Sequence, residues 1–489
     1  MNSVVLFLGA YLLVCLGFAY RGWKRRGEDL EDFFITKRTV GGFVAFMTFS
    51  ATLFSSFTLV GMPGFFYTHG IGSWVFIAFA DIFMALMIYF FGIRFWLLGK
   101  KFGYITPTEF LRDRYESDYV SVIAVLIGIV FLLPYISIQL IGAGIVLKGA
   151  LGIPAFYGSF LLALILIIYS ELGGMRTVAW TDALQGTILL IVGFLVAILF
   201  LREFGGISLM MSQAIEKYPE LMTVPGPKGL FTYQILISFF IMIIFMPVTQ
   251  PQLTVRYFIP ESKKTLKLMM MATPIFAFLA MLPQLFIGIG AKIAFPELAS
   301  GDQALTSVLT LIPPVVGAIA VTGVIAASMS TADSQFLVLS SLITKDFYVN
   351  ILNPKSSNRK RLKIARISMF LLLLLAFIIS LKPPKLIVTL SILSFAGTLQ
   401  VLPTMLGGLF WKRATREGAI SSMLVGVLTL SLFQWVLKPP FGIHQGIWGL
   451  IFGSLSFVLI SLITKPPEKK AKKILGYLKE ALGGLENGS

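Results

Sequence analysis

The 489-residue chain has one cysteine and two histidines, and only 13% of its residues are charged. A lone Cys15 excludes an intrachain disulfide framework and a cysteine-rich metal site. The chain also lacks a glycine loop before Lys-Ser/Thr, a His-Glu-x-x-His motif and a Gly-x-Ser-x-Gly motif. Since those motifs supply ATP binding and hydrolytic chemistry, we expect no enzyme activity and no organic cofactor.

Hydrophobic residues, in contrast, make up 57% of the chain, and the mean hydropathy is +0.87. Repeated apolar runs of about 18 or more residues are typical of a polytopic helical membrane protein embedded in a lipid bilayer. We therefore expect an all-α protein with about thirteen transmembrane helices, near residues 3–20, 41–68, 73–98, 118–148, 153–171, 178–202, 229–250, 267–295, 305–343, 363–381, 385–411, 416–436 and 442–464.

The net charge of +17 would suit a nucleic-acid partner, but the Lys and Arg residues cluster in short loops between apolar runs. That pattern is the positive-inside signal, so we expect no nucleic-acid binding. The first run has no basic residue before it and six after it, which predicts an N-terminus outside a cell membrane. Most basic residues, Arg256 among them, then fall in cytoplasmic loops. We expect the lysine-rich tail to form a cytoplasmic surface helix that contacts anionic lipid.

A hydroxyl-bearing face lies in the middle of the apolar run 305–343. At helical spacing, Ala327, Ser330, Thr331 and Ser334 share one side of the helix, and Asp333 flanks it. Oxygen ligands on one helix face inside a bilayer suit a small hard cation such as Na+. The alternative is that small residues allow close helix packing while the hydroxyls bond back to carbonyls of their own helix. We interpret the face as a cation site.

Two spans have broken patterns, the second at 49–64 and the seventh at 246–252, where Gly or Pro interrupts an apolar run beside polar residues. Such breaks free backbone groups to line a site near the bilayer midplane. The two broken spans each open a block of five spans, and an odd number inverts the second block relative to the first. The predicted divisions are 1–40 (first helix and basic loop), 41–204 (first repeat), 205–411 (outer loop and inverted repeat), 412–465 (two further helices) and 466–489 (basic tail).

Other polar residues within the spans leave alternatives open. Asp182 is either paired or cation-bound at membrane depth, or it caps the start of a helix. Tyr135 and Gln139 lie four residues apart on one face, as a packing hydrogen bond or as walls of a polar cavity. Gln400 is ambiguous in the same way. For the isolated Asp81 we expect a structural pairing.

Three motifs resemble the sodium/solute symporters, which include sodium-coupled proline, pantothenate, monocarboxylate, sugar and sialic acid transporters. They are YSELGGM (169–175) leading to WTDALQ (180–185), ASMST (327–331), and GLFWKR (408–413) followed by Gly418-Ala419. The resemblance covers roughly residues 1–465. It implies a leucine-transporter-type fold of two inverted five-helix repeats.

The resemblance also implies residue roles. The main Na+ site would use the carbonyls of Ala51, Phe54 and Ala327 and the hydroxyls of Ser330 and Thr331. Counterparts of a second Na+ site, present in some members, would be Asp182, Ser330, Asp333 and Ser334. An Asp at 333 departs from the small residue common in the family. Leu53 replaces the acidic residue of proline transporters.

The sequence therefore predicts Na+-driven symport of a small organic solute that bears a carboxylate and is of the monocarboxylate, proline or pantothenate type. The rivals are a proton-coupled transporter with Asp182 or Asp333 as carrier, a non-transporting membrane sensor, and a membrane-embedded enzyme. The sequence carries no signal for the oligomeric state. A solute site at the two breaks would be bordered by Ser55, Ser56, Thr58, Tyr135, Gln139, Thr249, Gln250 and Gln400.

Overall fold

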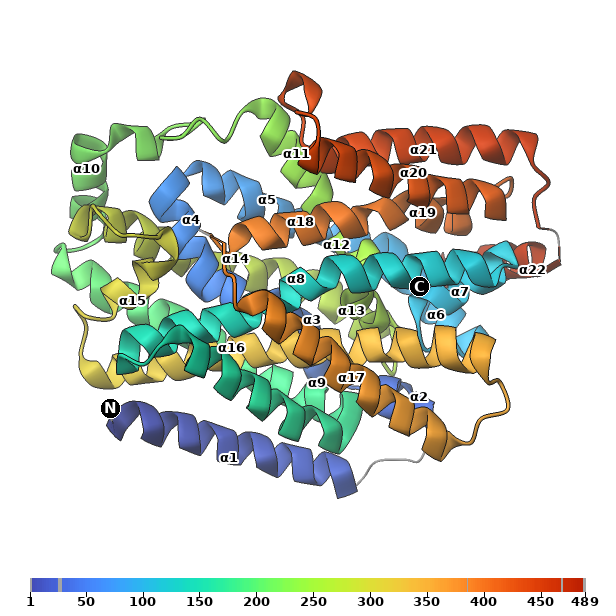
Figure 1. The fold of residues 1–489 in the computed structure, drawn as a ribbon, viewed down its shortest axis with the longest axis horizontal. Helices are drawn as coiled ribbons and strands as arrows, with labels where there is room; N and C mark the ends of the chain where they lie inside the picture. The colour runs from blue at the N-terminus through green and yellow to red at the C-terminus, as the bar shows by residue number, and fades with distance from the viewer. Residues whose placement is uncertain (1, 25–28, 385, 468, 487–489) are drawn as a thin grey trace.

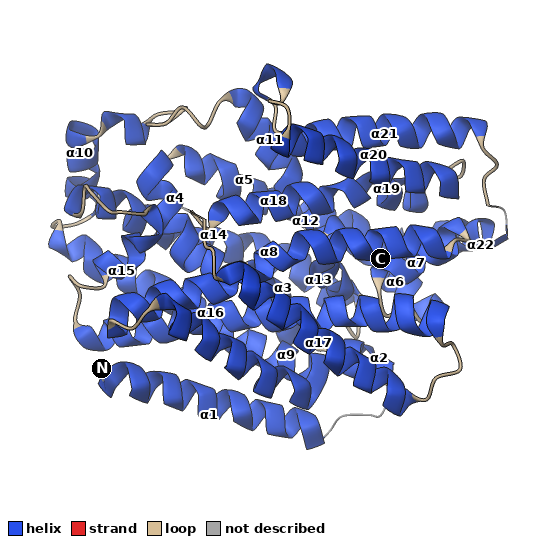
Figure 2. Ribbon diagram, in the orientation of Figure 1, coloured by secondary structure: helices blue, strands red, loops and turns tan. Residues whose placement is uncertain are grey.

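The structure, a computed structural model, describes residues 2–24, 29–384, 386–467 and 469–486, and at 2, 169–173 and 484–486 the backbone alone. Helices dominate it, and none of the described residues lies in a β-strand (Figure 2). In Figure 1 the long helices run roughly from left to right. The N-terminus, α10 (Ile207–Lys217) and α15 (Ala304–Val308) lie at the left end, and α7 (Pro107–Tyr115) and α22 (Lys469–Glu486) at the right. The predicted outer and cytoplasmic segments are thus at opposite ends of the molecule.

Each of the thirteen predicted spans coincides with helix. They are α1 (Asn2–Lys24), α3 (Gly42–Leu53) with α4 (Met62–His69), α5 (Gly72–Met87) with α6 (Ile93–Phe102), α8 (Asp118–Leu151), the two halves of α9 (Ala155–Glu203), α11 (Tyr233–Ile244), α14 (Lys263–Ala294), α16 (Pro314–Ser341), α17 (Asn358–Ser380), α18 (Val388–Thr398) with α19 (Leu402–Phe410), α20 (Arg416–Trp435) and α21 (Gln445–Ile463). Further short helices are α2 (Leu30–Ile35), α12 (Met246–Thr249) and α13 (Pro251–Thr254).

Among the described residues, 10 helices are long and apolar enough to cross a membrane, or 11 with the bent pair α3–α4. The two remaining predicted spans hold shorter apolar helices, Ala155–Ile168 and Tyr233–Ile244. The largest boundary difference is at 305–343, where α16 begins only at Pro314. A proline is favoured at the first position of a helix, and Pro313 precedes it in an extended conformation. The number of membrane crossings stays a prediction.

Both predicted breaks are present. The backbone at Phe54 is extended (φ −106°, ψ 126°), so α3 stops at Leu53. The chain resumes in a π-helical turn at Phe57–Gly61, and the two halves of the span are bent by 48°. In the seventh span Gln250 is extended (φ −96°, ψ 113°) between α12 and α13. Proline at the first turn of each short helix accounts for these starts, since its missing N–H removes no helical hydrogen bond there.

Helix α16 forms the centre of the bundle. Its side chains are almost continuously buried from Ala318 to Ser341, and it packs against α1, α3, α8 and α9. A helix that is buried on all sides does not select one face by hydrophobicity. The polar side chains of α16 are therefore oriented by the groups that neighbouring helices present to them.

The C-terminal tail forms the predicted surface helix, α22, which packs against the helices of the bundle. Ala471, Ile474 and Leu478 are buried, and α22 packs against α6 and α7. The Lys470 ammonium lies 2.7 Å from Asp113 Oδ1. The helix therefore has one face on the protein at the same end as α7, and contact of its other face with anionic lipid remains a prediction.

Candidate functional site

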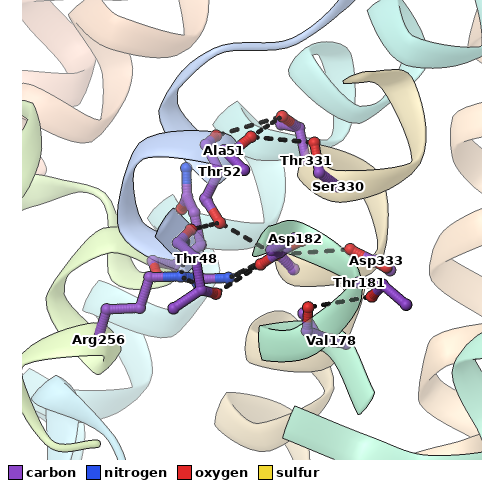
Figure 3. A network of polar contacts seen from close by, with 12 residues as sticks. Thr48, Ala51, Thr52, Val178, Thr181, Asp182, Arg256, Ser330, Thr331 and Asp333 are labelled. Atoms are coloured by element: carbon purple, nitrogen blue, oxygen red, sulfur yellow. Dashed lines mark hydrogen bonds and ion pairs between the residues drawn. The ribbon is translucent and has the colours of Figure 1, made fainter. Parts of the chain in front are cut away.

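The hydroxyl face of α16 lies against the break in the second span. The Ser330 hydroxyl is 3.0 Å from the Ala51 carbonyl oxygen and 2.9 Å from the Ala327 carbonyl oxygen. The Thr331 hydroxyl is 3.5 Å from the Ala51 oxygen and 3.2 Å from the Thr52 oxygen. Oxygen atoms of two helices thus converge within hydrogen-bonding distance (Figure 3). Uncharged hydroxyl and carbonyl oxygens are ligands that suit Na+.

Phe54, the fifth predicted ligand, directly follows the end of α3. Because its backbone is extended, the last carbonyls of α3 lose their helical partners and become free to bind a cation. Ser328, on another side of α16, behaves as the packing alternative expects. Its hydroxyl donates to the Val324 carbonyl of its own helix at 2.8 Å. The packing interpretation therefore holds for Ser328, whereas the Ser330 hydroxyl also reaches a carbonyl of α3.

A buried ion pair lies beside these oxygens. Arg256 Nη2 is 3.0 Å from Asp182 Oδ2, and both side chains have zero exposure. Asp182 Oδ2 also accepts from the Thr48 hydroxyl at 2.5 Å, and Arg256 Nε donates to the Thr48 carbonyl at 3.1 Å. The pair joins α9 and α3 to the 3₁₀ turn Val255–Tyr257 that follows the second break (Figure 3).

Ser334 and Asp333 extend this network. The Ser334 hydroxyl oxygen accepts from Arg256 Nη2 at 2.5 Å, and it lies 3.4 Å from Asp182 Oδ2 and 3.5 Å from Asp333 Oδ1. Within the described part of the chain, Asp182 Oδ1 and Asp333 Oδ2 have no hydrogen-bond partner. Two buried carboxylates therefore face one guanidinium and keep two unsatisfied oxygens.

The alternative that Asp182 caps a helix start is wrong. The second half of α9 begins at Gly174, whose backbone breaks the helix (φ 58°, ψ −156°), so Asp182 lies two turns inside. Arg256 was missed as a site residue, because charge counting places it in a cytoplasmic loop. The available signal was that Arg256 is the single charged residue in the stretch 247–260, directly after the second break.

Tyr135 and Gln139 of α8 face the break in the second span. Gln139 Oε1 accepts from the Ser56 hydroxyl at 2.7 Å and from the Ser56 N–H at 3.3 Å. The Tyr135 side chain lies near enough to Ser55 to interact with it. The Ser55 N–H in turn donates to the Thr58 hydroxyl at 3.2 Å. The structure thus brings five of the predicted solute residues into one cluster.

Gln250 and Thr249, at the second break, have different environments. The side-chain amide of Gln252 donates to Gln250 Oε1 at 2.6 Å, whereas Gln250 Nε2 has no partner within the described residues. Thr249 lines a small cavity of about 20 Å³ together with Thr398 of α18. That volume holds a water molecule but no organic solute.

Gln400 stands apart from the other predicted solute residues. Its amide donates to the carbonyls of Ala396 and Gly446 at 2.8 and 3.0 Å. Its oxygen lies against Gly426 and Gly449, where even one added methyl group would collide with it. Gln400 therefore fills the contact between α18 and the last two spans, α20 and α21.

A cavity of about 580 Å³ opens between the ends of α8, α9 and α17 nearest α15. Its lining includes Lys148, Ser159 and Asp302, and its volume is within the usual range of small-molecule pockets. Asp302 Oδ2 accepts from the Ile387 N–H at 2.9 Å, while Oδ1 has no partner in the described part of the chain. Burial raises the pKa of Asp302 to about 7.

Comparison with known proteins identifies the family. The model of the sodium:solute symporter family matches residues 33–426. The chain belongs to the sodium:solute symporter family. It is 29% identical over 464 residues to the sodium/pantothenate symporter of Haemophilus influenzae, covering 94% of this chain and 96% of that one. It is 26% identical over 505 residues to an osmoregulated proline transporter of Bacillus subtilis, covering 98% and 99%. This symporter is accordingly a multi-pass transport protein of the cell membrane.

Solved structures agree on the fold. A Na+-coupled sialic acid symporter superposes with a TM-score of 0.80 at 20% identity, over 95% of this chain and 99% of that one. A nucleobase-cation-symport-1 family transporter gives 0.57 at 13% identity, over 91% and 98%. The predicted all-α, leucine-transporter-type fold is confirmed. Of the motifs behind the resemblance, the side chains at 169–173 lie outside the described residues.

Proposed function

We propose that this symporter imports a small carboxylate-bearing solute together with Na+ by alternating access. The observation that carries the proposal is the contact of Ser330 and Thr331 with the Ala51 carbonyl across the break in the second span. A Na+ ion held there by Ala51, Phe54, Ala327, Ser330 and Thr331 would replace these hydrogen bonds with coordination. Such an ion fastens α3 to α16, which holds the outward-facing arrangement in which the solute binds.

A second Na+ is supported by the charges beside the first site. Asp182 and Asp333 bring two carboxylates against the single guanidinium of Arg256, and two of their oxygens have no partner within the described residues. An unsatisfied charge in the membrane interior is costly, and one bound cation balances this group. The proposed ligands are Asp182, Asp333, Ser334 and Ser330.

The solute site proposed here is the cluster at the first break together with the second break. It contains no Lys or Arg, so a solute carboxylate would be met by hydroxyls, amides, Na+ and the N-terminus of the helix that starts at Phe57. A compact anion or zwitterion suits such a site, in keeping with relatives that are pantothenate and proline symporters. The proposed lining residues are Ser55, Ser56, Thr58, Tyr135, Gln139, Thr249 and Gln250.

The architecture proposed for transport is two inverted repeats, 41–204 and 205–411, with the N-terminus outside and the tail cytoplasmic. The distribution of Lys and Arg supports this orientation. Each Na+ entering with a neutral solute carries one charge, worth about 2.3 kcal/mol per 100 mV. Import of such a solute is therefore electrogenic.

Purified protein in proteoliposomes tests the function. An inward Na+ gradient should drive accumulation of a labelled solute from a panel of pantothenate, proline, lactate, pyruvate and glucose, and an inside-negative potential should accelerate it. The proton-coupled alternative rests on Asp182 and Asp333 as carriers. Uptake driven by a proton gradient without Na+ would favour that alternative and contradict Na+ coupling. Accumulation of glucose alone would contradict a carboxylate solute.

A further inference from the structure

Asp81 of α5 lacks the pairing that the sequence led us to expect. Its side chain is 2% exposed, and no ion pair or hydrogen bond to its carboxylate occurs among the described residues. Two other fully buried carboxylates have strong partners. Asp182 has Arg256, and Asp346 accepts from hydroxyls of Thr106, Thr108 and Ser121. Asp81 is thus a buried acid for which this part of the chain supplies no donor.

The carboxylate lies near the proposed solute site. Helix α5 packs against α4 and α12, which are the helices next to the two breaks. Asp81 acts electrostatically on Tyr135, and the Tyr135 side chain is also influenced by Ser55 of the first break. In the span Gly72–Phe102, Asp81 is about 14 Å from the end nearest α4, at a rise of about 1.5 Å per residue. That depth corresponds to roughly half the hydrocarbon thickness.

Burial of an isolated carboxylate in a bilayer costs several kcal/mol unless something positive or hydrogen-donating meets it. No basic group of the described residues forms an ion pair with Asp81, so an ammonium group of a ligand would supply the missing counter-charge. Aromatic rings lie beside Tyr135. The Phe395 ring lies 5.5 Å from that of Tyr135 and 6.1 Å from that of Phe57, both edge-on. An ammonium group is stabilised both by a carboxylate and by aromatic faces.

We infer that Asp81 binds an ammonium group of the transported solute, so that the solute is an amino acid-like zwitterion and not a simple carboxylate. This inference rests on the proposed function. The two ends of the solute would be recognised separately: the ammonium by Asp81 beside the aromatic rings, and the carboxylate by the hydroxyls, amides and Na+ at the breaks.

Pairs of solutes that differ only in the amino group test it. Alanine is compared with lactate, and proline with tetrahydrofuran-2-carboxylate, as competitors of Na+-driven uptake into proteoliposomes, with pantothenate as a further amine-free probe. In the wild type the amine-bearing member of a pair should compete at least tenfold better. Asp81→Asn should abolish that preference while the amine-free members compete as before. Asp81→Glu, which keeps the charge, should retain part of it.

Asp346→Asn is the matched control, because it alters another buried carboxylate that has hydroxyl partners of its own; its preference should equal that of the wild type. Equal competition by both members of each pair in the wild type, or an unchanged preference in Asp81→Asn, would overturn the inference and leave Na+-coupled transport intact. If Asp81→Asn does not fold, the ratio of competition by the two members of each pair in the wild type still tests whether the solute carries an ammonium group. Absence of Na+-driven uptake for every probe would contradict the proposed function itself.

Discussion

Arg256 Nη2 lies 3.0 Å from Asp182 Oδ2, with both side chains fully buried. The pair connects the segment after the second break to the middle of α9, and through Thr48 it also reaches α3. Na+ ligands are proposed on either side of it. A cation bound at Asp182 and the guanidinium of Arg256 therefore act on the same carboxylate, which couples cation binding to the position of the second broken helix.

The ion pair leads to a stability prediction. Arg256→Gln leaves Asp182 as an uncompensated buried charge, and loss of one partner of a buried pair costs about 3–5 kcal/mol. We expect a clear drop in the Tm of the detergent-solubilised protein. The double variant Asp182→Asn with Arg256→Gln should recover much of that loss, since no charge remains unpaired. A double variant as unstable as the sum of its single changes would contradict a direct interaction.

Asp182→Asn alone tests the second cation. Removing one of two carboxylates should lower the number of Na+ ions moved per solute, or abolish uptake if that ion is obligatory. The measurement is the reversal potential of uptake in proteoliposomes at fixed solute gradients. An unchanged stoichiometry and rate would limit Asp182 to pairing with Arg256.

If the main Na+ site is where we propose, removing its hydroxyls should lower the affinity of the transporter for Na+. Ser330→Ala and Thr331→Ala should each raise the Na+ concentration for half-maximal uptake roughly tenfold. A contact to a charged group is worth about 1.5–3 kcal/mol, and tenfold corresponds to about 1.4 kcal/mol. Ser328→Ala is the control, because its hydroxyl bonds only within α16. Unchanged Na+ dependence in both site variants would remove the ion from this helix.

For the solute, Gln139→Ala should weaken apparent affinity roughly tenfold or more, by the same energy of one hydrogen bond to a charged group. Na+ binding without solute, followed by intrinsic tryptophan fluorescence, should stay nearly intact. Gln400→Ala offers a matched control, since this buried glutamine bonds to Ala396 and Gly446 away from the cluster. Equal losses of affinity in the two variants would indicate that Gln139 acts through packing alone.

Asp302 predicts a pH effect. Burial raises its pKa to about 7 in the folded protein, whereas the pKa of an aspartate in an unfolded chain is about 4. Between these values the folded state binds more protons than the unfolded state, so the contribution of Asp302 to stability falls as pH rises. The Tm of the wild type should therefore decline relative to Asp302→Asn from pH 5 to pH 8. Asp118→Asn, at a half-exposed carboxylate, is the control. Parallel Tm curves for wild type and Asp302→Asn would contradict this assignment.

Sequence alone determined the helical class, the positions of the long helices and both breaks. Apolar length and the placement of Gly and Pro act locally, through the cost of burying backbone groups in lipid, and need no knowledge of neighbours. The shared face of Ser330 and Thr331 likewise follows from helical spacing. Each of these features can be recognised within a segment of sequence the length of one helix, without knowing what packs against it.

Only the tertiary structure decided which polar groups meet. Arg256 and Asp182 are 74 residues apart, and Gln139 reaches Ser56 across 83. Gln400 and Asp81 are both polar residues in apolar runs, and the sequence does not distinguish their environments. In the structure Gln400 bonds to backbone carbonyls of α18 and α21, whereas Asp81 has no partner in the described residues. In a bundle buried on all sides, hydrophobic periodicity does not orient a side chain. A polar side chain is oriented instead by the partner that a distant helix presents, because leaving a polar group unpaired in the membrane costs more free energy than a local conformational preference can supply.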